Sequence, residues 1–522
     1  MIAMTLAQVA AAVGGTLHDC PDPSARVTGT VEFDSRKITP GGLFLALPGE
    51  RVDGHDHAAA AVAAGAVGVL AARPVGVPAV VVPAAAAHDR RAMALAADVD
   101  GSGAAVLAGL GRLARAVVDA LPHLRVIGVT GSSGKTSTKD LLAAVLAPLG
   151  PVVAPPGSFN NELGHPWTAL RADEGTRNLV LELSARGEGH VAALCEIAPP
   201  HIGVVLNVGT AHLGEFGSRE AIARTKGELV QALPAADQGG VAVLNADDPL
   251  VAAMATRTTA RVVFVGTSAG AHVRATDIHL DEQARPRFTL HTGQGSIDVA
   301  LAVHGEHNIG NALAAAAVAE ECGASLPQIA EALAGARAAS VRRMDVRTRS
   351  DGVTVINDSY NANPDSMRAA LKALVTLSRG DTGRRPRRSW AVLGEMAELG
   401  QDSVAAHDGI GRLAVRLDVQ RLVVVGAAAR PMHTGAVQEG SWGEESVLVP
   451  DVETAVALLR DAVRPGDVVL VKASQSVGLW RIADALMGTD ALLGTDALLA
   501  DAAVGTAATE GHGAIQEQEV AK

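Results

Sequence analysis

The chain has 522 residues, which is more than one hydrophobic core accommodates and predicts about three domains. Apolar residues make up 48% of the chain and charged residues 19%, a composition typical of a soluble globular protein. The formal net charge of −12 argues against broad nucleic-acid binding, because that function requires a basic face to neutralise phosphates. The apolar run Ala58–Leu70 is shorter than the roughly 20 residues of a membrane span, so no span is expected.

Three cysteines, Cys20, Cys195 and Cys322, lie far apart and show no C-x-x-C spacing. This pattern is typical of reduced thiols in the cytosol and not of disulfides or a zinc site. The N-terminus lacks the basic flank of a signal peptide, and we expect a cytoplasmic protein. Nothing indicates an obligate interface, so we expect a monomer. The basic cluster RRPRR at 384–388 is predicted to be a solvated loop.

Residues 1–105 form the first predicted unit, a small α/β domain. The stretches GGLFLALPG, AVGVLAA and PAVVVP are short and apolar, which predicts buried strands. Alanine-rich helical patterns lie between them.

Residues 106–338 form the second predicted unit, an α/β domain with a mostly parallel sheet. Helical patterns separate several of its apolar runs, which indicates crossover connections. The expected strands are Arg125–Thr130, Asn178–Leu183, His201–Val208, Val241–Asn245 and Arg261–Gly266. Alternation with Gly and Pro turns over His272–Val303 predicts an antiparallel extension. The expected helices are Lys135–Ala147, Asn308–Cys322 and Pro327–Ala334.

Residues 339–487 form the third predicted unit, a Rossmann-like α/β domain. Its expected strands are Val353–Asn357, Trp390–Leu393, Leu422–Gly426 and Val468–Ala473. Residues 488–522 contain the duplication GTDALLGTDALL and are expected to form a flexible tail.

The stretch TGSSGKTS follows the predicted strand Arg125–Thr130 and precedes a helix. Gly131 and Gly134 allow a tight turn that directs backbone N–H groups at phosphate oxygens. Lys135 supplies a cation for the phosphates, and Thr136 supplies a hydroxyl for magnesium. The usual P-loop would have glycine at Val129, so we expect a shorter, specialised P-loop that binds a nucleotide.

Two further side chains follow the next strands of the predicted sheet. Glu182 lies near the carboxyl end of one strand, and His212 follows the other. Ligands bind outside the carboxyl ends of parallel strands, so Lys135, Glu182 and His212 are expected to converge at one edge. A carboxylate there can hold magnesium, and a histidine can coordinate a second metal or orient a substrate. Lys226 lies about four helical turns beyond His212.

Three stretches, TGSSGKTS, NVGTAHLGEFGSREAIARTKGEL and HGEHNIGNALAAAAVA, together resemble the Mur ligase superfamily. Members of this family form amide bonds with ATP. The stretch DSRKITPGGLFLALPGERVDGHDH resembles the uridine-nucleotide domain of the members that add the third amino acid or the terminal dipeptide. FNNELGHPWTAL and INDSYNANPDSM resemble the dipeptide-adding member, and the D-N-P-R-type motif of the diaminopimelate-adding member is absent.

The resemblance implies site residues by position. It implies catalytic roles for Lys135, Glu182, His212 and Lys226, and metal binding by Thr136, Glu182 and His212. Lys226 matches a lysine that several relatives carbamylate. ATP would be bound by Gly131, Ser132, Ser133, Gly134, Lys135, Thr136, Ser137, Asn308, Arg343 and Asp358. The UDP-linked substrate and the incoming dipeptide would be bound by Ser35, Arg36, Lys37, Asn160, Asn161, Asn361 and Asn363.

The implied activity is ATP-dependent addition of D-alanyl-D-alanine to UDP-N-acetylmuramoyl-tripeptide, with ATP and Mg²⁺ required. The third peptide residue stays open between lysine and a diaminopimelate isomer. Two alternatives also stay open: another amide ligase of the same superfamily, and a catalytically silent nucleotide-binding regulator.

The sequence departs from the family near its C-terminal end. Where the family usually shows K-G-S-R, this chain has Lys472, Ala473, Ser474 and Gln475. This departure weakens a functional interpretation of Lys472 and Ser474. The histidines of DGHDH lie within the N-terminal family pattern and are expected to be structural.

Overall fold

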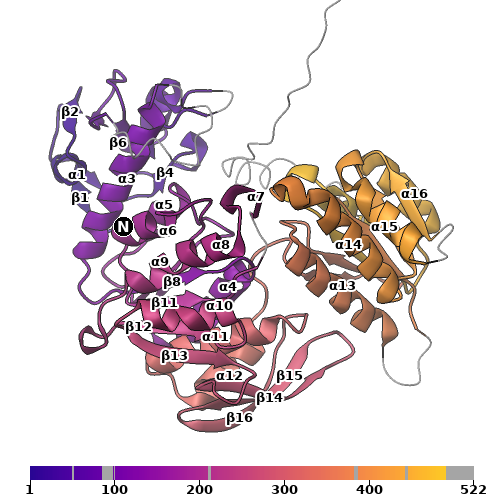
Figure 1. The fold of residues 1–522 in the computed structure, drawn as a ribbon. Coiled ribbons are helices and arrows are strands. Elements are labelled where there is room, and N and C mark those ends of the chain that lie inside the picture. Colours follow the sequence, from indigo (N-terminus) through magenta and orange to yellow (C-terminus); the bar gives the residue numbers. More distant parts are fainter. Residues whose placement is uncertain are drawn as a thin grey trace, which may run out of the picture.

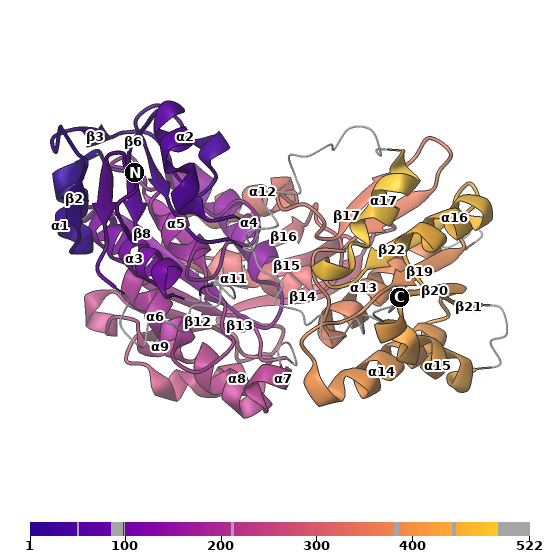
Figure 2. The same ribbon diagram turned by 90° about the horizontal axis from the view of Figure 1, so that it is seen from above.

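The computed structural model describes residues 1–49, 52–84, 98, 100–209, 213–380, 386–440 and 445–488. These residues form three α/β units, each built on its own sheet (Figure 1). The N-terminal and middle units lie together, and the C-terminal unit stands beside the middle unit in both views (Figures 1 and 2). The predicted α/β architecture of three domains is confirmed.

The N-terminal unit has a small sheet in the order β2-β7-β6-β5-β4, parallel except for β2. Its elements are β1 Met4–Thr5, α1 Leu6–Val13, β2 Thr16–His18, β3 Arg26–Val27, β4 Val31–Glu32, the 3-10 helix η1 Ser35–Lys37, β5 Gly42–Leu45, the 3-10 helix η2 Gly54–His57, α2 Ala58–Ala63, β6 Ala66–Ala71 and β7 Ala79–Val81. His55 is structural, as expected, because its ring contacts Asp53 at 2.7 Å and accepts from the backbone N–H of Ala72 at 3.1 Å.

The middle unit has a long sheet in the order β16-β15-β14-β13-β12-β11-β8-β10-β9. Its strands are β8 Arg125–Thr130, β9 Val152–Val153, β10 Asn178–Glu182, β11 Ile202–Val205, β12 Val241–Asn245, β13 Arg261–Gly266, β14 Val273–Leu280, β15 Pro286–Thr292 and β16 Gly295–Ala300. Strands β14 to β16 pair antiparallel, as the alternating pattern predicted, and the other pairs are parallel.

Helices cover this sheet on both faces. They are α3 Ser102–Asp119, α4 Lys135–Leu146, α5 Gly164–Ala169, α6 His190–Ile197, α7 Leu213–Phe216, α8 Arg219–Lys226, α9 Glu228–Gln231, α10 Pro249–Ala252, α11 Asn308–Glu321 and α12 Leu326–Gly335. Helix α3 spans the predicted boundary at residue 105 because its apolar side chains share one core with α1 and with the middle sheet. On the other side of the sheet, α11 packs against α4 through buried alanines.

The C-terminal unit has a sheet in the order β17-β18-β22-β19-β20-β21, parallel except for β17. Its elements are β17 Asp345–Thr348, β18 Thr354–Asn357, α13 Pro364–Arg379, β19 Ser389–Leu393, α14 Ser403–Arg416, β20 Arg421–Val425, α15 Arg430–Glu439, β21 Ser446–Val449, α16 Val452–Ala462, β22 Val468–Lys472 and α17 Trp480–Met487. The predicted tail lies outside the described residues, apart from Gly488. None of the described helices is long and apolar enough to cross a membrane.

The prediction that the basic cluster before β19 is a solvated loop is wrong for Arg387 and Arg388, the two of its arginines that the structure describes. Arg387 donates to the carbonyl oxygen of Gly466 at 2.7 Å. Arg388 pairs with Asp467 at 2.6 Å, and the same carboxylate accepts from Trp390 Nε1 at 3.0 Å. These contacts tie the start of β19 to the turn before β22. The remaining arginines, 384 and 385, lie outside the described residues.

We therefore predict that Asp467→Ala lowers the free energy of unfolding by about 3 kcal/mol, because it leaves Arg388 without its buried counter-charge. Urea unfolding followed by fluorescence measures the change. Glu453→Ala is the matched control, since its pair with Arg481 is exposed, and an exposed pair contributes less than about 1 kcal/mol. Equal losses for both variants would contradict the prediction.

Candidate active site

A cavity of about 610 Å³ lies between the middle and C-terminal units. On the middle side it is lined by the loop residues 132–137 and by Ser158, Asn160, Asn161 and Asn207. On the C-terminal side it is lined by Arg343, Asp358, Tyr360, Asn361, Asn363, Asp365, Lys472 and Ser474. The segments that form this cavity are far apart in sequence, and several of them follow strand ends, among them the segments after β8, β11, β18 and β22.

The loop between β8 and α4 presents backbone donors to the cavity. Gly134 has φ 84°, and a Cβ there would lie 2.6 Å from Asn311 Oδ1, so both conformation and space require glycine. Asn207 follows β11 and accepts from the N–H groups of Ser132 and Ser133, each at 3.0 Å. Helix α4 has no side-chain cap, so its first N–H groups remain available for an anion.

Lys135 is the first residue of α4 and lines the cavity. Its Nζ donates to the carbonyl oxygen of Gly131 at 2.7 Å. Burial lowers the pKa of Lys135, Glu182 opposes this change, and the cation of Arg343 adds to it. A bound anion would stabilise the charged amine, as expected of a phosphate-binding lysine.

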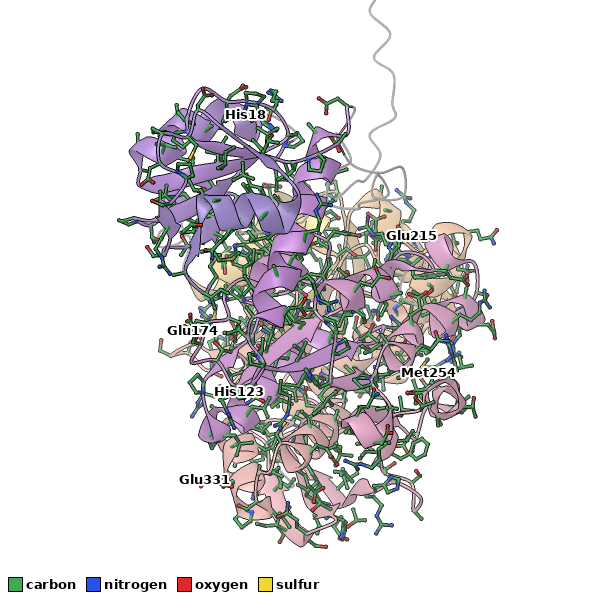
Figure 3. The ribbon with its side chains drawn as sticks, turned by 90° about the vertical axis from the view of Figure 1, so that its left-hand side faces the viewer. His18, His123, Glu174, Glu215, Met254 and Glu331 are labelled. Atoms are coloured by element: carbon green, nitrogen blue, oxygen red, sulfur yellow. The ribbon has the colours of Figure 1, made fainter. Side chains whose placement is uncertain are left out.

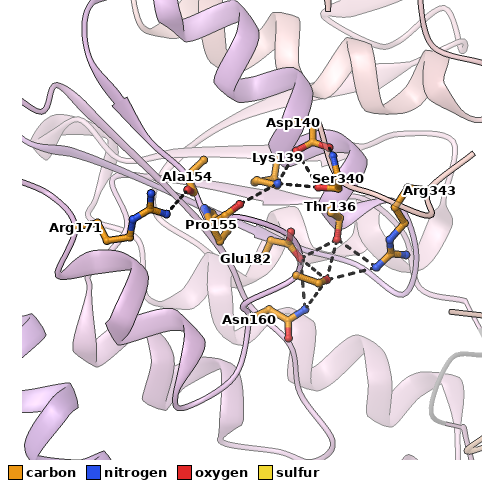
Figure 4. Close-up of polar contacts among 11 residues, drawn as sticks. Thr136, Lys139, Asp140, Ala154, Pro155, Asn160, Arg171, Glu182, Ser340 and Arg343 are labelled. Atoms are coloured by element: carbon orange, nitrogen blue, oxygen red, sulfur yellow. Dashed lines mark hydrogen bonds and ion pairs between the residues drawn. The ribbon is translucent and has the colours of Figure 1, made fainter. Parts of the chain in front are cut away.

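Glu182 ends β10 behind the cavity wall and is fully buried. Its Oε2 accepts from Thr136 Oγ1 at 3.2 Å and from Ser158 Oγ and Asn160 Nδ2 at 3.4 Å each (Figure 4). Its Oε1 is buried and has no hydrogen-bond partner among the described residues. A buried carboxylate oxygen without a partner is costly, which indicates that a cation or another donor binds here.

Arg343 reaches this group from the C-terminal unit. Its Nη2 lies 3.5 Å from Thr136 Oγ1 and 3.4 Å from Ser158 Oγ, and its guanidinium stacks on Tyr360 at 4.1 Å from the ring centroid (Figure 4). Its Nε is buried and has no hydrogen-bond partner in the described part of the chain. The guanidinium can therefore donate to an anion in the cavity.

Asp358 and Lys472 form a buried ion pair on the C-terminal side of the cavity, with Nζ 2.6 Å from Oδ2. Lys472 also donates to the carbonyl oxygen of Asn361 at 2.8 Å, and Asp358 accepts from the N–H of Met344 at 3.1 Å. Burial lowers the pKa of Lys472 although Asp358 opposes this change. The pair holds β18, β22 and the Asn361 loop together, and Ser474 lines the same cavity.

The remaining residues implied by the family resemblance lie outside the lining of this cavity or outside the described residues. Asn308 is buried and does not line this cavity; it donates to the carbonyl oxygen of His304 at 2.8 Å at the start of α11. Lys226 ends α8 and is buried, and its pKa is lowered well below the usual value by burial and by Lys135. Ser35, Arg36 and Lys37 form η1 in the N-terminal unit, outside the cavity lining. His212 lies outside the described residues.

Several cavity residues were not predicted from the sequence. Asn207 lies two residues beyond β11, so the strand-end rule that identified Glu182 would have found it. Asp365 approaches Gly209 so closely that a Cβ there would clash with its carboxylate. Asp365 and His307 also line a second cavity of about 400 Å³ between α11 and α13, next to the first. No sequence signal indicated these contacts between units.

Aromatic side chains join η1 and its neighbours to the Asn160 loop. The rings of Phe33, Phe159 and Trp167 have centroid separations of 4.8 to 6.4 Å. Trp167 Nε1 donates to the carbonyl oxygen of Val31 at 2.8 Å. Glu32 is partly buried beside this cluster, and burial raises its pKa to about 7. The cluster fixes the N-terminal unit against the cavity wall.

Comparison with known proteins gives the family. Three family models match: "Mur ligase family, catalytic domain" over residues 29–116, "Mur ligase middle domain" over 129–319, and "Mur ligase, glutamate ligase domain" over 342–475. The UDP-N-acetylmuramoyl-tripeptide--D-alanyl-D-alanine ligase of Mycobacterium tuberculosis is 63% identical, over 93% of this chain and 98% of its own. The Escherichia coli protein of that name is 34% identical, over 93% and 99%.

Solved structures agree with these relatives. The crystal structure of MurF from Acinetobacter baumannii has a TM-score of 0.78 at 30% identity, over 93% of this chain and 99% of that one. MurF ligase from Thermotoga maritima in complex with ADP has a TM-score of 0.70 at 28% identity, over 89% and 98%. This chain belongs to the Mur ligase family.

The raised pKa of Glu32 predicts a pH-dependent stability. Below its ordinary value of 4.5 the carboxyl is protonated in both states; between 4.5 and about 7 the unfolded chain loses the proton first, so stability falls. Glu32→Gln removes this loss, and we expect wild type to lose about 1–2 kcal/mol relative to the variant between pH 4.5 and 7, since partial exposure screens the effect.

Free energies of unfolding measured at both pH values for the two proteins check this prediction. Glu331→Gln is the control, because Glu331 is exposed on α12 (Figure 3). A parallel pH dependence of wild type and Glu32→Gln would contradict the raised pKa.

Proposed function

We propose that this protein is an ATP-dependent ligase that joins D-alanyl-D-alanine to UDP-N-acetylmuramoyl-tripeptide, giving the pentapeptide, ADP and phosphate in peptidoglycan synthesis. The observation that carries the proposal is the meeting of the TGSSGKTS loop and Arg343 at one cavity between two units, with the buried carboxylate of Glu182 bonded to Thr136 of that loop. Relatives of that name, aligned over nearly the whole chain, support the substrate assignment.

The two adjoining cavities suit ATP. The phosphates are assigned to the N–H groups at the start of α4 and to Lys135, where the helix dipole and a cation favour anions. The base is assigned to the second cavity, lined in part by Ile309, Gly310 and Leu313. Asn308 acts there through its bond at the start of α11, which holds the neighbouring residues in place.

The residues around Glu182 fit magnesium. The partnerless Glu182 Oε1 and the Thr136 hydroxyl are hard oxygen donors, and Mg²⁺ in nucleotide sites takes one or two such ligands together with phosphate oxygens. Bound magnesium would neutralise charge on the phosphates. No group of three His, Cys, Asp or Glu able to hold a metal occurs within the described residues. His212 is proposed as a further metal ligand on family grounds alone.

A carboxylate is a poor acyl donor, so the peptide carboxylate first attacks the γ-phosphorus of ATP and releases ADP, forming an acyl phosphate. Lys135 and Arg343 lower the repulsion between the two anions as they approach. The amine of D-alanyl-D-alanine then attacks the acyl carbon, and the tetrahedral intermediate expels phosphate and loses a proton. The C-terminal unit covers the cavity and limits hydrolysis of the acyl phosphate.

The binding positions of the two peptide substrates are proposed from the residues that line the cavity and from the family resemblance. Asn160 and Asn161 are proposed to contact the muramoyl peptide, because they line the cavity and follow Phe159, whose ring packs against Phe33 of the N-terminal unit. The segment Ser35–Lys37 is proposed to bind the uridine diphosphate. Asn361 and Asn363, which line the C-terminal side, are proposed to bind the dipeptide.

Lys226 is proposed as a carbamylation site. Burial and Lys135 lower its pKa, which favours the neutral amine, the form that reacts with carbon dioxide.

Phosphate release with ATP, Mg²⁺, UDP-N-acetylmuramoyl-tripeptide and D-alanyl-D-alanine tests the proposal. We expect release to require all three substrates, with the third peptide residue supplied as lysine or as diaminopimelate. Release with a different amino donor only would indicate another amide ligase. ATP binding without turnover under every condition would indicate a regulator.

Lys135→Ala is expected to lower kcat about 100- to 1,000-fold, because it removes a cation from the phosphoryl-transfer site. Circular dichroism should show an unchanged fold. Arg115→Ala is the control, since Arg115 is a partly exposed cation on α3 away from the cavity. Normal turnover in Lys135→Ala would refute the assignment of the loop.

A further inference from the structure

The segment Ser340–Met344, here called the strap, connects the middle unit to the C-terminal unit and carries Arg343. Both Arg342 and Met344 have positive φ, 59° and 49°, which is uncommon outside glycine. Arg342 stacks on Trp480 at 4.4 Å from the ring centroid, and Met344 donates its N–H to Asp358. The residues on either side of Arg343 are thus held by the C-terminal unit, while Arg343 itself extends to the middle unit.

Ser340, at the start of the strap, is held by two charged side chains of α4. Its backbone N–H donates to Asp140 Oδ2 at 3.0 Å, and its hydroxyl donates to Asp140 Oδ1 at 3.2 Å. The same hydroxyl accepts from Lys139 Nζ at 3.1 Å (Figure 4). Lys139 pairs with Asp140 at 2.5 Å and also donates to the carbonyl oxygen of Pro155 at 3.0 Å. We call Lys139, Asp140 and Ser340 the α4 clamp.

The clamp and the reactive end of the cavity lie on one helix. Lys139 and Asp140 follow Thr136 by three and four residues, which is one turn of α4. Arg343 follows Ser340 by three residues and reaches Thr136 from the strap. Ser340 and Arg343 therefore both contact α4, and the position of Arg343 is set relative to the phosphate-binding loop that precedes the same helix.

The polar contacts of Arg343 are too weak to fix its position. Its bonds to Thr136 and Ser158 are 3.5 and 3.4 Å long, and its Nε has no partner among the described residues. The clamp, by contrast, is buried: Lys139 is 3% exposed and Ser340 is 6% exposed. A buried ion pair adds little to stability, and in several proteins buried polar groups specify one geometry instead.

We propose that Asp140 and Ser340 are positioning residues for phosphoryl transfer: the α4 clamp fixes the strap so that Arg343 meets the γ-phosphate of ATP. This inference rests on the proposed function for the role of Arg343. It assigns to Lys139 the task of stabilising the Asp140 carboxylate, whose two oxygens bind the N–H and the hydroxyl of Ser340.

Ser340→Ala tests the clamp with little risk to folding, because the N–H bond to Asp140 and the Lys139 pair both remain. We expect kcat to fall about tenfold, since small displacements of a transition-state contact lower rates by such factors. The KM for ATP should stay within about twofold, because ground-state binding is retained. Ser340→Thr keeps the hydroxyl and is expected to restore kcat.

A double-mutant cycle separates positioning from a merely structural role. If the clamp acts through Arg343, Ser340→Ala lowers turnover in wild type but not in an Arg343→Ala background. ADP formation with enzyme in excess measures the slow variants. Ser325→Ala is the matched control, because it removes a hydroxyl from the N-terminus of α12 away from the cavity; it should lower Tm and leave kcat unchanged.

A binding measurement tests the clamp without the peptide substrates. With magnesium present, Ser340→Ala should weaken binding of ADP–aluminium fluoride, a mimic of the transferring phosphoryl group, about tenfold. Binding of ADP alone should be unchanged. Equal weakening of both ligands, an unchanged kcat in Ser340→Ala, or multiplicative losses in the double mutant would overturn the proposal. Absence of wild-type turnover would instead contradict the proposed function, and the binding measurement would still decide the clamp.

Discussion

The register between the parallel strands β8, β10 and β11 is the constraint on which the site depends. Val129 pairs with Glu182 in β10, and Thr130 pairs with Val205 in β11. The loop after β8, the carboxylate that ends β10 and Asn207 beyond β11 therefore leave the sheet at one edge. A slip of one residue would turn Glu182 to the opposite face. The apolar side chains that bury both faces of these strands therefore also set the positions of the polar groups of the site.

The second requirement is electrostatic, and one unit does not meet it alone. At the phosphate end of the cavity the middle unit provides Lys135 and the opposing carboxylate Glu182. The additional cation, Arg343, comes from the C-terminal unit. Because two anions must meet in the reaction, the charge that favours their approach is complete only when both units are in place. Domain arrangement and catalysis are therefore linked by the position of one side chain.

Local patterns in the sequence predicted much of the sheets and little of the contacts between units. Strand β8 was predicted with its observed bounds, because an apolar run ended by a glycine-rich loop leaves little choice. The interpretation of RRPRR failed because Arg388 binds Asp467, a partner 79 residues away. Ser340 lies 200 residues from Asp140, and neither belongs to a motif. Long-range polar contacts depend on how units pack, which periodicity does not report.

The strained backbone of the strap has a physical explanation in this arrangement. Left-handed conformations at Arg342 and Met344 each cost about 1 kcal/mol or more and persist only where surrounding contacts enforce them. Stacking on Trp480 and the bond to Asp358 provide such contacts on the C-terminal side. With its neighbours turned to that unit, Arg343 is the strap side chain that the structure directs to the phosphate end of the cavity. The strained conformations thus allow Arg342 and Met344 to contact the C-terminal unit while Arg343, between them, contacts the middle unit.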